Sequence, residues 1–424
     1  MQFRVLCALG LFAACNGSSG AAPDAAAQAP DASACPSTSS TGNVSVTVTQ
    51  GGAPICGATA YFLAADNTLV ATVQTDTAGH AAANLTAGGS VTVVHAGAID
   101  PATPHELESW LDVQPGDELA DDLTAVRDDV NRQLSVSAYP GGSAAQYVVM
   151  APCNSGTGYI AAGSAAQLSI DCGVGVEAVD LIAFAVDASS SYIAAQYMSG
   201  VPLAGTSTID LAGTWQPTQS VPIQYANIGS AGQLTVTIST PLAAGLLDDD
   251  DIALTAAGGS AAGAFTWPAQ LASGTRVVTT NLTEQSIASW APIGSSVTLD
   301  FGGQIAQSID AYPALDATAT SFSWTLSGSG VTPALNIATL AAPAATWTIV
   351  SFGAATQIAL PQIPKTIVDV STVGSGVVTG LLVPASVTYR NVLGSGAFFA
   401  SFAGLIAASP SGVVTETTTP GIPL

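Results

Sequence analysis

The residue types best suited to acid–base and metal chemistry are scarce in this chain. Histidine occurs only at His80, His95 and His105. Because histidine is the side chain that most often transfers protons near neutral pH, an active site in the rest of the chain would rely on carboxylates or tyrosine. His105 with Glu106 and Glu108 offers ligands for a metal ion. We expect these residues on a loop, where neighbouring side chains point in different directions, and therefore predict no metal there.

The run Asp248-Asp249-Asp250-Asp251 is the other arrangement that suggests ion binding. Calcium-binding loops usually place their ligands at alternate positions and include a glycine, which this run does not. We favour a solvated turn for this run and keep its aspartates as weak candidates for Ca²⁺.

The sequence has no motif for a catalytic nucleophile or for a bound nucleotide. The HExxH, GxSxG, Walker and dinucleotide-binding patterns are all absent from it. We therefore expect no cofactor and no enzymatic activity. The alternative is a secreted enzyme that acts on carbohydrate or peptide through dispersed carboxylates in the C-terminal half, because such pairs leave no local signature.

The cysteines favour an oxidising compartment. Apart from Cys7 and Cys15 near the N-terminus, four cysteines remain. Four cysteines allow three pairings. We favour Cys35–Cys56 and Cys153–Cys172, because each pair brackets a compact segment and the two pairs lie far apart in the sequence. Each bridge would stabilise the fold by about 3 kcal/mol by loop closure. A metal site is the competing interpretation, but the chain has no CxxC spacing and no histidine near either pair.

The N-terminus has the layout of a secretory signal. Arg4 precedes a short apolar run that ends in small residues. Phe12-Ala13-Ala14-Cys15 resembles a bacterial lipobox, with Phe12 where leucine is usual. The resemblance implies that residues 1–14 are a signal peptide and that Cys15 is diacylated and anchors the chain to a membrane. An ordinary secretory signal with an incidental cysteine is the alternative.

Residues 15–41 are expected to be a disordered tether. Residues 16–34 are almost entirely small or polar, so they cannot bury enough apolar area to offset ordering of the chain. A flexible coil of that length would reach about 25 Å. The residue after Cys15 is Asn16 rather than the aspartate of enteric inner-membrane lipoproteins. We therefore expect an outer-membrane lipoprotein of the cell envelope that faces the periplasm or the exterior.

The charge balance excludes two classes of partner. The 424 residues carry 29 acidic and 6 basic side chains, for a net charge of −23. Such a surface repels nucleic acid and anionic lipid head groups, so we expect neither as a partner reached through charge.

Period-2 alternation predicts strands along the whole chain. Val44, Val46 and Val48 alternate with polar residues, as in a half-buried strand. Similar runs occur at residues 90–94, 133–137, 146–150, 234–238 and 296–301. Glycine and proline are frequent between these runs, which favours many short strands. The exception is residues 117–133, which we expect to form a short acidic helix or a solvated connector. The predicted fold is all-β, with antiparallel β-sandwich domains in tandem.

Residues 42–98 resemble a known family. Pro54-Ile55-Cys56-Gly57-Ala58, then Thr75-Asp76-Thr77-Ala78-Gly79, then Leu85-Thr86-Ala87-Gly88 follow the order of turns in the carboxypeptidase regulatory-like domain. The resemblance implies a seven-stranded, transthyretin-like sandwich with no catalytic site. Cys56 departs from the family pattern, which is consistent with an added bridge to Cys35.

The remaining organisation is set by length and composition. The chain is long enough for two to four domains. After the signal peptide, the tether and the first sandwich, we expect an acidic connector at 99–133, a second sandwich at 134–216 and a C-terminal β region at 217–424 with one large or two small sandwiches.

Tryptophans are frequent in the later part of the chain. They are Trp215, Trp267, Trp290, Trp324 and Trp347. We expect them to fill sandwich cores; the alternative is a stacking platform for sugars. Taken together, the sequence predicts a non-enzymatic, lipid-anchored envelope protein whose β-domains bind or scaffold an unknown protein or glycan ligand.

Overall fold

The computed structural model describes Cys35 and residues 39–50, 53–95, 105–123, 130–151, 158–161, 165–170, 177–203, 209–211, 213–228, 233–242, 245–255, 257–268, 275–281, 285–292, 296–302, 305–309, 314–315, 320–343, 345–373, 375–383, 412–418 and 422–423. These residues form strands, turns and the short 3₁₀ helix η3 (Val370–Thr372), which confirms the all-β fold with several sheets. No helix in this part of the chain is long and apolar enough to cross a membrane.

The first unit is a sandwich of two sheets. One sheet contains β1 (Val44–Gln50), β2 (Ala53–Pro54), β5 (His80–Ala83) and β8 (Glu118–Leu123). The facing strands are β3 (Thr59–Leu63), β4 (Leu69–Gln74), β6 (Gly89–His95) and β7 (His105–Val113). The predicted alternation on β1 is confirmed, because Val44, Val46 and Val48 are fully buried against Phe62 and Val93.

Two strands of this sandwich lie where we expected a connector. β7 pairs antiparallel with β6, and β8 pairs parallel with β1. The prediction of a helix or connector at 117–133 was therefore wrong for residues 118–123, and β9 (Val130–Val136) is also a strand. Leu119 and Asp121 point into the core at alternate positions, so β8 has strand periodicity despite its acidic composition.

The sheet that contains β3, β4, β6 and β7 continues far beyond the first sandwich. Its other members are β17 (Gln233–Leu242), β18 (Gly245–Thr255), β20 (Thr275–Asn281), β21 (Gln285–Pro292), β27 (Leu335–Ala342), β28 (Ala345–Phe352), β30 (Ser375–Leu382), β31 (Gly412–Thr418) and β32 (Ile422–Pro423). The junction is the parallel pairing of β28 with β7. The sheet therefore crosses the domain boundaries that we expected after residues 98 and 216.

Both faces of β6 are buried, which explains why apolar residues occupy neighbouring positions along this strand. All seven of its residues are buried, because the first sandwich covers one face of the sheet and a second core covers the other. The second core holds Phe322, Trp324 and Trp347. Short strands contribute side chains to it: β23 (Ser308–Ile309), β25 (Ser321–Ser323), β26 (Leu326–Ser327) and β29 (Gln357–Ala359). β24 (Ala314–Leu315) pairs with β25.

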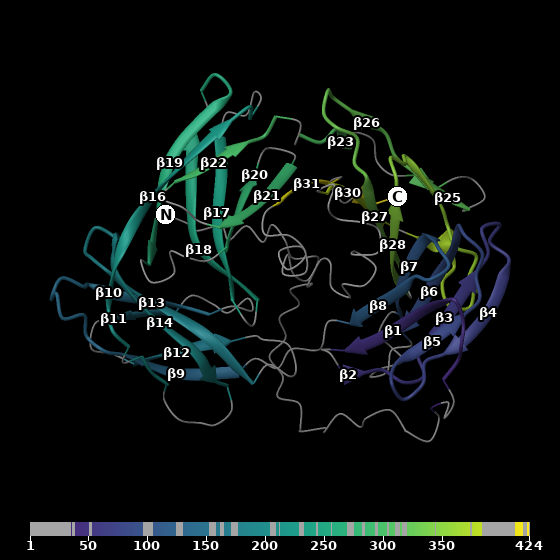
Figure 1. The fold of residues 1–424 in the computed structure, drawn as a ribbon, viewed down its shortest axis with the longest axis horizontal. Helices are drawn as coiled ribbons and strands as arrows, with labels where there is room; N and C mark the ends of the chain where they lie inside the picture. Colours follow the sequence, from purple (N-terminus) through teal and green to yellow (C-terminus); the bar gives the residue numbers. More distant parts are fainter. Residues whose placement is uncertain are drawn as a thin grey trace.

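The middle of the chain forms further sheets. They are built from β10 (Gln146–Met150), β11 (Gly158–Ala161), β12 (Ala165–Ile170), β13 (Ala178–Val186), β14 (Tyr192–Pro202), β15 (Ile209–Leu211), β16 (Gln216–Ala226), β19 (Ser260–Pro268) and β22 (Val297–Asp300) together with β9. Figure 1 shows β9–β19 on the left and β1–β8 on the right. β16 pairs with β14 and with β19, so it continues across the boundary expected at residue 216.

Candidate functional site

A cluster of titratable side chains lies between the two sheets of the first sandwich. It consists of His95 at the end of β6, Glu108 on β7 and Asp121 on β8. Glu108 lies opposite Val93, and residues opposite each other in an antiparallel pair point to the same face. Glu108 therefore points, like Val93 and His95, toward the sheet that contains β8.

Strand register brings the third member to the same place. Asp121 lies beside Val48 in the parallel pairing of β8 with β1, and Val48 is fully buried in the first core. Because neighbouring residues in adjacent strands point to the same face of a sheet, the side chain of Asp121 points inward, as that of Val48 does. Three strands thus each place a polar residue where their neighbours carry apolar ones, and together they define the buried cluster His95–Glu108–Asp121.

The cluster is tightly hydrogen-bonded. The imidazole Nε2 of His95 lies 2.6 Å from Oδ2 of Asp121, and the two side chains are 8% and 2% exposed. The imidazole Nδ1 of His95 is buried and has no hydrogen-bond partner within the described part of the chain. The contact joins β6 to β8, so it ties the two sheets of the sandwich together.

Glu108 completes the cluster through its carboxyl group. Burial raises the pKa of this carboxyl group well above its ordinary value, and the nearby charge of Asp121 and a hydrogen bond to it raise the pKa further. Two carboxyl groups at hydrogen-bond distance favour a proton between them. The cluster can therefore hold a proton inside the sandwich, where His95 and Asp121 are buried and Glu108 is half-buried.

The metal-ligand candidates of the sequence do not form a site here. Residues 105–108 lie on the strand β7, so our placement of them on a loop was wrong. Glu106 is exposed, whereas Glu108 points into the buried cluster. Among the residues that the structure describes, no group of three or more His, Cys, Asp or Glu side chains is suited to hold a metal ion.

The run of four aspartates lies in a strand and not in the solvated turn that we expected. Residues 248–251 belong to β18, which pairs antiparallel with β17. Asp250 lies opposite Ile238 and Asp248 opposite Ser239, so the register shifts at Asp249. Such a shift is typical of a β-bulge, which accommodates one extra residue in the strand.

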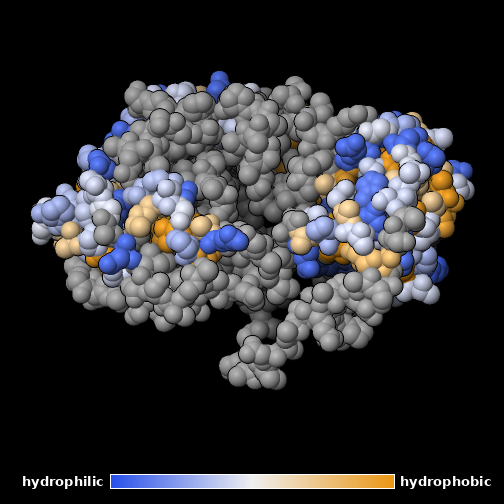
Figure 2. All heavy atoms as spheres, turned by 60° about the horizontal axis from the view of Figure 1, so that its bottom comes forward, coloured by the Kyte–Doolittle hydropathy of each residue, from blue (hydrophilic) through white to orange (hydrophobic). Residues whose placement is uncertain are grey.

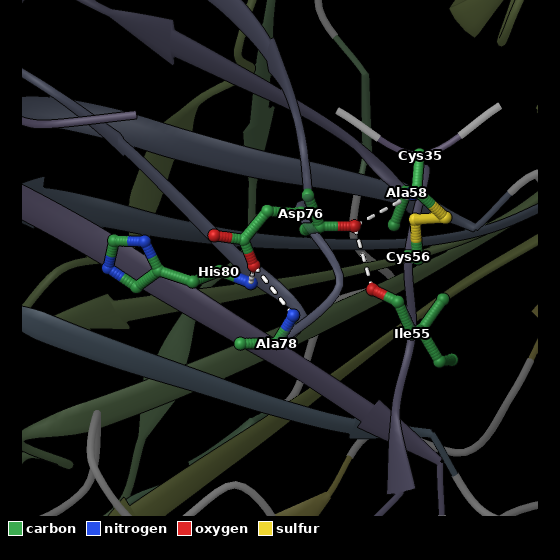
Figure 3. Close-up of a disulfide and its surroundings, with 8 residues drawn as sticks. Cys35, Ile55, Cys56, Ala58, Asp76, Ala78 and His80 are labelled. Carbon is green, nitrogen blue, oxygen red and sulfur yellow. Dashed lines mark hydrogen bonds between the residues drawn. A yellow bond between two sulfur atoms is a disulfide. The ribbon is translucent and has the colours of Figure 1, made fainter. Parts of the chain in front are cut away.

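The predicted disulfide Cys35–Cys56 is present, with 5.8 Å between the Cα atoms. Figure 3 shows this bridge beside the turn that follows β4, where the side chain of Asp76 points toward the backbone of Ala78 and His80. Cys15, Cys153 and Cys172 lie outside the described residues. Lipidation at Cys15 and the bridge Cys153–Cys172 therefore stay predictions.

Asp76 organises this turn. Its Oδ1 accepts hydrogen bonds from the backbone N–H groups of Ala78 and His80 at 2.8 and 3.0 Å, and Oδ2 accepts one from the hydroxyl of Ser39. These hydrogen bonds, that from Ser39 first, lower the pKa of Asp76 although the side chain is buried. The Asp76 carboxylate therefore links the segment after Cys35 to the turn between β4 and β5.

The tryptophans divide into core residues and one that is half-exposed. Trp290, Trp324 and Trp347 are buried, as predicted for core residues. Trp215 is half-buried against the apolar core that β10, β13 and β14 share, and its ring lies 5.8 Å from that of Tyr139 between centroids. Trp267 lies on β19 and nothing more is described for its side chain.

The sequence pattern did not single out the cluster His95–Glu108–Asp121. The available signal was period-2 alternation: Asp121 follows Leu119 by two positions, and Glu108 precedes Trp110 by two. A polar residue at a position that alternation marks as inward indicates a buried polar site. Their convergence depends on the pairing of three strands, which alternation does not reveal.

Comparison with known proteins does not identify a family. No family model and no curated protein matches the chain. Among solved structures, the Bacillus anthracis TIE protein matches with 11% identity and a TM-score of 0.16, over 61% of this chain and 49% of that protein. The match thus spans about half of that protein's length. At this TM-score the likeness carries no argument about fold or function.

Proposed function

We propose that the chain is a non-enzymatic protein of the bacterial cell envelope, anchored through a lipid on Cys15, whose β-domains bind or scaffold a protein or glycan outside the membrane. The observation that carries this proposal is the position of the cluster His95–Glu108–Asp121. The histidine and carboxyl groups that converge there face the inside of a sandwich, where they stabilise the packing of two sheets.

Other features support the same proposal. The Cys35–Cys56 bridge is typical of a protein in an oxidising compartment, and it lies directly after the low-complexity segment that we interpret as a tether. We also propose that residues 42–98 belong to a carboxypeptidase regulatory-like sandwich, which β7 and β8 extend. Two facing sheets with a valine-rich core are compatible with that interpretation.

Fractionation of cells that express Cys15→Ser tests the anchor. We expect the wild-type chain in the detergent-extracted envelope, labelled by a palmitate analogue, and the variant in the soluble fraction without label. A variant that keeps both the label and the membrane fraction would contradict the anchor. Cys7→Ser is the matched control, because Cys7 precedes the predicted cleavage site.

An activity screen tests the non-enzymatic part. The soluble Cys15→Ser chain should show no turnover of glycosidase, esterase or peptidase substrates above a mock purification. Turnover that one carboxylate substitution in the C-terminal half abolishes would favour the alternative of a carbohydrate- or peptide-active enzyme.

A further inference from the structure

Among the residues that the structure describes, the edge strand β4 has no partner on one hydrogen-bonding side. It is the last strand of the sheet that begins at β18, and within the described residues β3 is the only strand that pairs with it. We propose that two copies of this chain associate by antiparallel pairing of their β4 strands. The inference does not depend on the lipid anchor.

The direction of the backbone groups supports this pairing. The N–H of Thr75 donates to the carbonyl of Ala58 on the side of β3, at 2.9 Å. Backbone groups alternate along a strand, so those of Thr72 and Gln74 point away from β3, toward the open side. A twofold axis at Thr72 would place this residue opposite its counterpart in the second copy, and Val70 opposite Gln74. Such a pairing forms about six hydrogen bonds.

The side chains of β4 lack the features that normally protect an edge strand. Its sequence, Leu-Val-Ala-Thr-Val-Gln, has no charge and no proline, whereas natural edges usually carry a lysine, a proline or an inward-pointing charge. Leu69 is 56% exposed and Val70 is 49% exposed; Val331 is the other exposed large hydrophobic residue in the described part of the chain. Figure 2 shows hydrophobic residues on the right-hand part of the molecule, toward the margin where Figure 1 places β4.

Charge argues for a second copy as the occupant. The chain carries a net charge of −23, so most surfaces of two copies repel each other. β4 offers an uncharged stretch, since Asp66 lies in the hairpin tip before the strand and Asp76 is buried after it. A basic peptide would find no acidic partner on the strand itself, whereas a second β4 matches both its polarity and its twist.

The size of the edge sets the expected strength. A six-residue strand buries much less than the roughly 1,600 Å² of a standard interface. We therefore expect a weak dimer with a Kd of about 10 μM, in which exchange is fast. Val70, Thr72 and Gln74 are exposed on the outer face, so cross-strand contacts between their side chains would add to the hydrogen bonds.

Sedimentation velocity of the Cys15→Ser chain across concentrations tests the proposal. The dimer fraction should rise with concentration. Thr72→Pro removes an outward N–H at an edge position where proline is tolerated, and Thr72→Lys places two like charges directly opposite each other at the axis. Each should weaken dimerisation by at least tenfold. The control Val331→Lys introduces the same charge at an exposed valine away from β4 and should dimerise like the parent chain.

A crosslinking variant makes the test independent of those substitutions. Residues opposite each other at the axis have Cα atoms about 5.5 Å apart, within the range of a disulfide. Thr72→Cys should therefore form a covalent dimer under mild oxidation, and Val331→Cys should not. A parent chain that stays monomeric, a dimer unaffected by both β4 substitutions, or equal crosslinking at the two cysteines would each overturn the proposal.

Discussion

The indole N–H of Trp347 donates a 2.8 Å hydrogen bond to the hydroxyl of Ser109, and the two buried residues are 238 positions apart in the sequence. The same hydroxyl lies 2.7 Å from that of Thr92. All three side chains are fully buried, so this short polar network joins β6, β7 and β28 at the junction of the first sandwich with the later part of the sheet.

Removal of the Ser109 hydroxyl should destabilise the whole fold. In Ser109→Ala the N–H of Trp347 loses its partner in a buried position, which costs about 1–3 kcal/mol. We expect the free energy of unfolding, measured by urea titration with tryptophan fluorescence, to fall by that amount. Ser220→Ala, on an exposed position of β16, should change it by less than about 0.5 kcal/mol. Equal effects of the two variants would contradict the role of the network.

Glu108 should make stability depend on pH in a defined direction. Because its pKa is raised in the folded chain, the folded state keeps a proton that the unfolded state releases above about pH 4.5. The contribution of Glu108 to the free energy of unfolding therefore falls as pH rises from that value through the folded pKa. Glu108→Gln keeps a neutral side chain at all pH values. The free energy of unfolding of the variant minus that of wild type should therefore be larger at pH 8 than at pH 5.

Urea titrations at both pH values measure this difference. Glu106→Gln is the matched control, because it makes the same change two residues away on β7 at an exposed position. His95 and Asp121 are the other titratable side chains of the cluster, and both are present in the wild type and in the two variants. The same change in the free energy of unfolding between the two pH values in wild type and in Glu108→Gln would contradict the prediction.

Asp76 should show the opposite dependence. Its folded pKa is lowered, so its stabilising effect is present above the unfolded pKa and is lost as pH falls through the folded value. Asp76→Ala should lower the free energy of unfolding by about 2 kcal/mol at pH 7, because backbone N–H groups lose a charged acceptor. Asp66→Ala removes a similar turn aspartate that is exposed, and should have little effect. A smaller loss for Asp76→Ala than for Asp66→Ala would contradict this assignment.

Peptide mapping without reduction tests the second predicted bridge. Cys35 and Cys56 should appear as one linked peptide pair, which serves as an internal reference because the structure contains that bridge. Cys153 and Cys172 should appear as another. Free thiols at Cys153 and Cys172 in natively secreted material, with the reference bridge intact, would contradict the prediction.

Local sequence patterns predicted those features that depend on neighbouring residues. The alternation on residues 44–48 gives β1, and the short loop between Cys35 and Cys56 favours their bridge. β7 and β8 were missed because charged residues such as Glu108 and Asp121 occupy inward positions, where their partners offset the cost of burial. Composition alone made this segment resemble a solvated connector.

The long-range features could not be predicted in this way. Nothing in the residues around Trp347 indicates that β28 pairs with β7, because parallel pairing of distant strands leaves no local pattern. We placed the expected domain boundaries in turn-rich stretches. The structure instead pairs β28, late in the chain, with β7 of the first sandwich. The buried cluster depends on the same kind of information, since its three members come from separate strands.

The junction of β7 with β28 also fixes an order of events during synthesis. A chain made from its N-terminus completes β7 long before β28 exists, so one edge of the first sandwich stays unpaired while the middle sheets are made. The pairing of β28 with β7 joins a late strand to an early one, which is slow for contacts so distant in sequence. During that interval, β28 from a neighbouring chain would satisfy the same hydrogen bonds, so crowded synthesis favours exchange of this strand between copies.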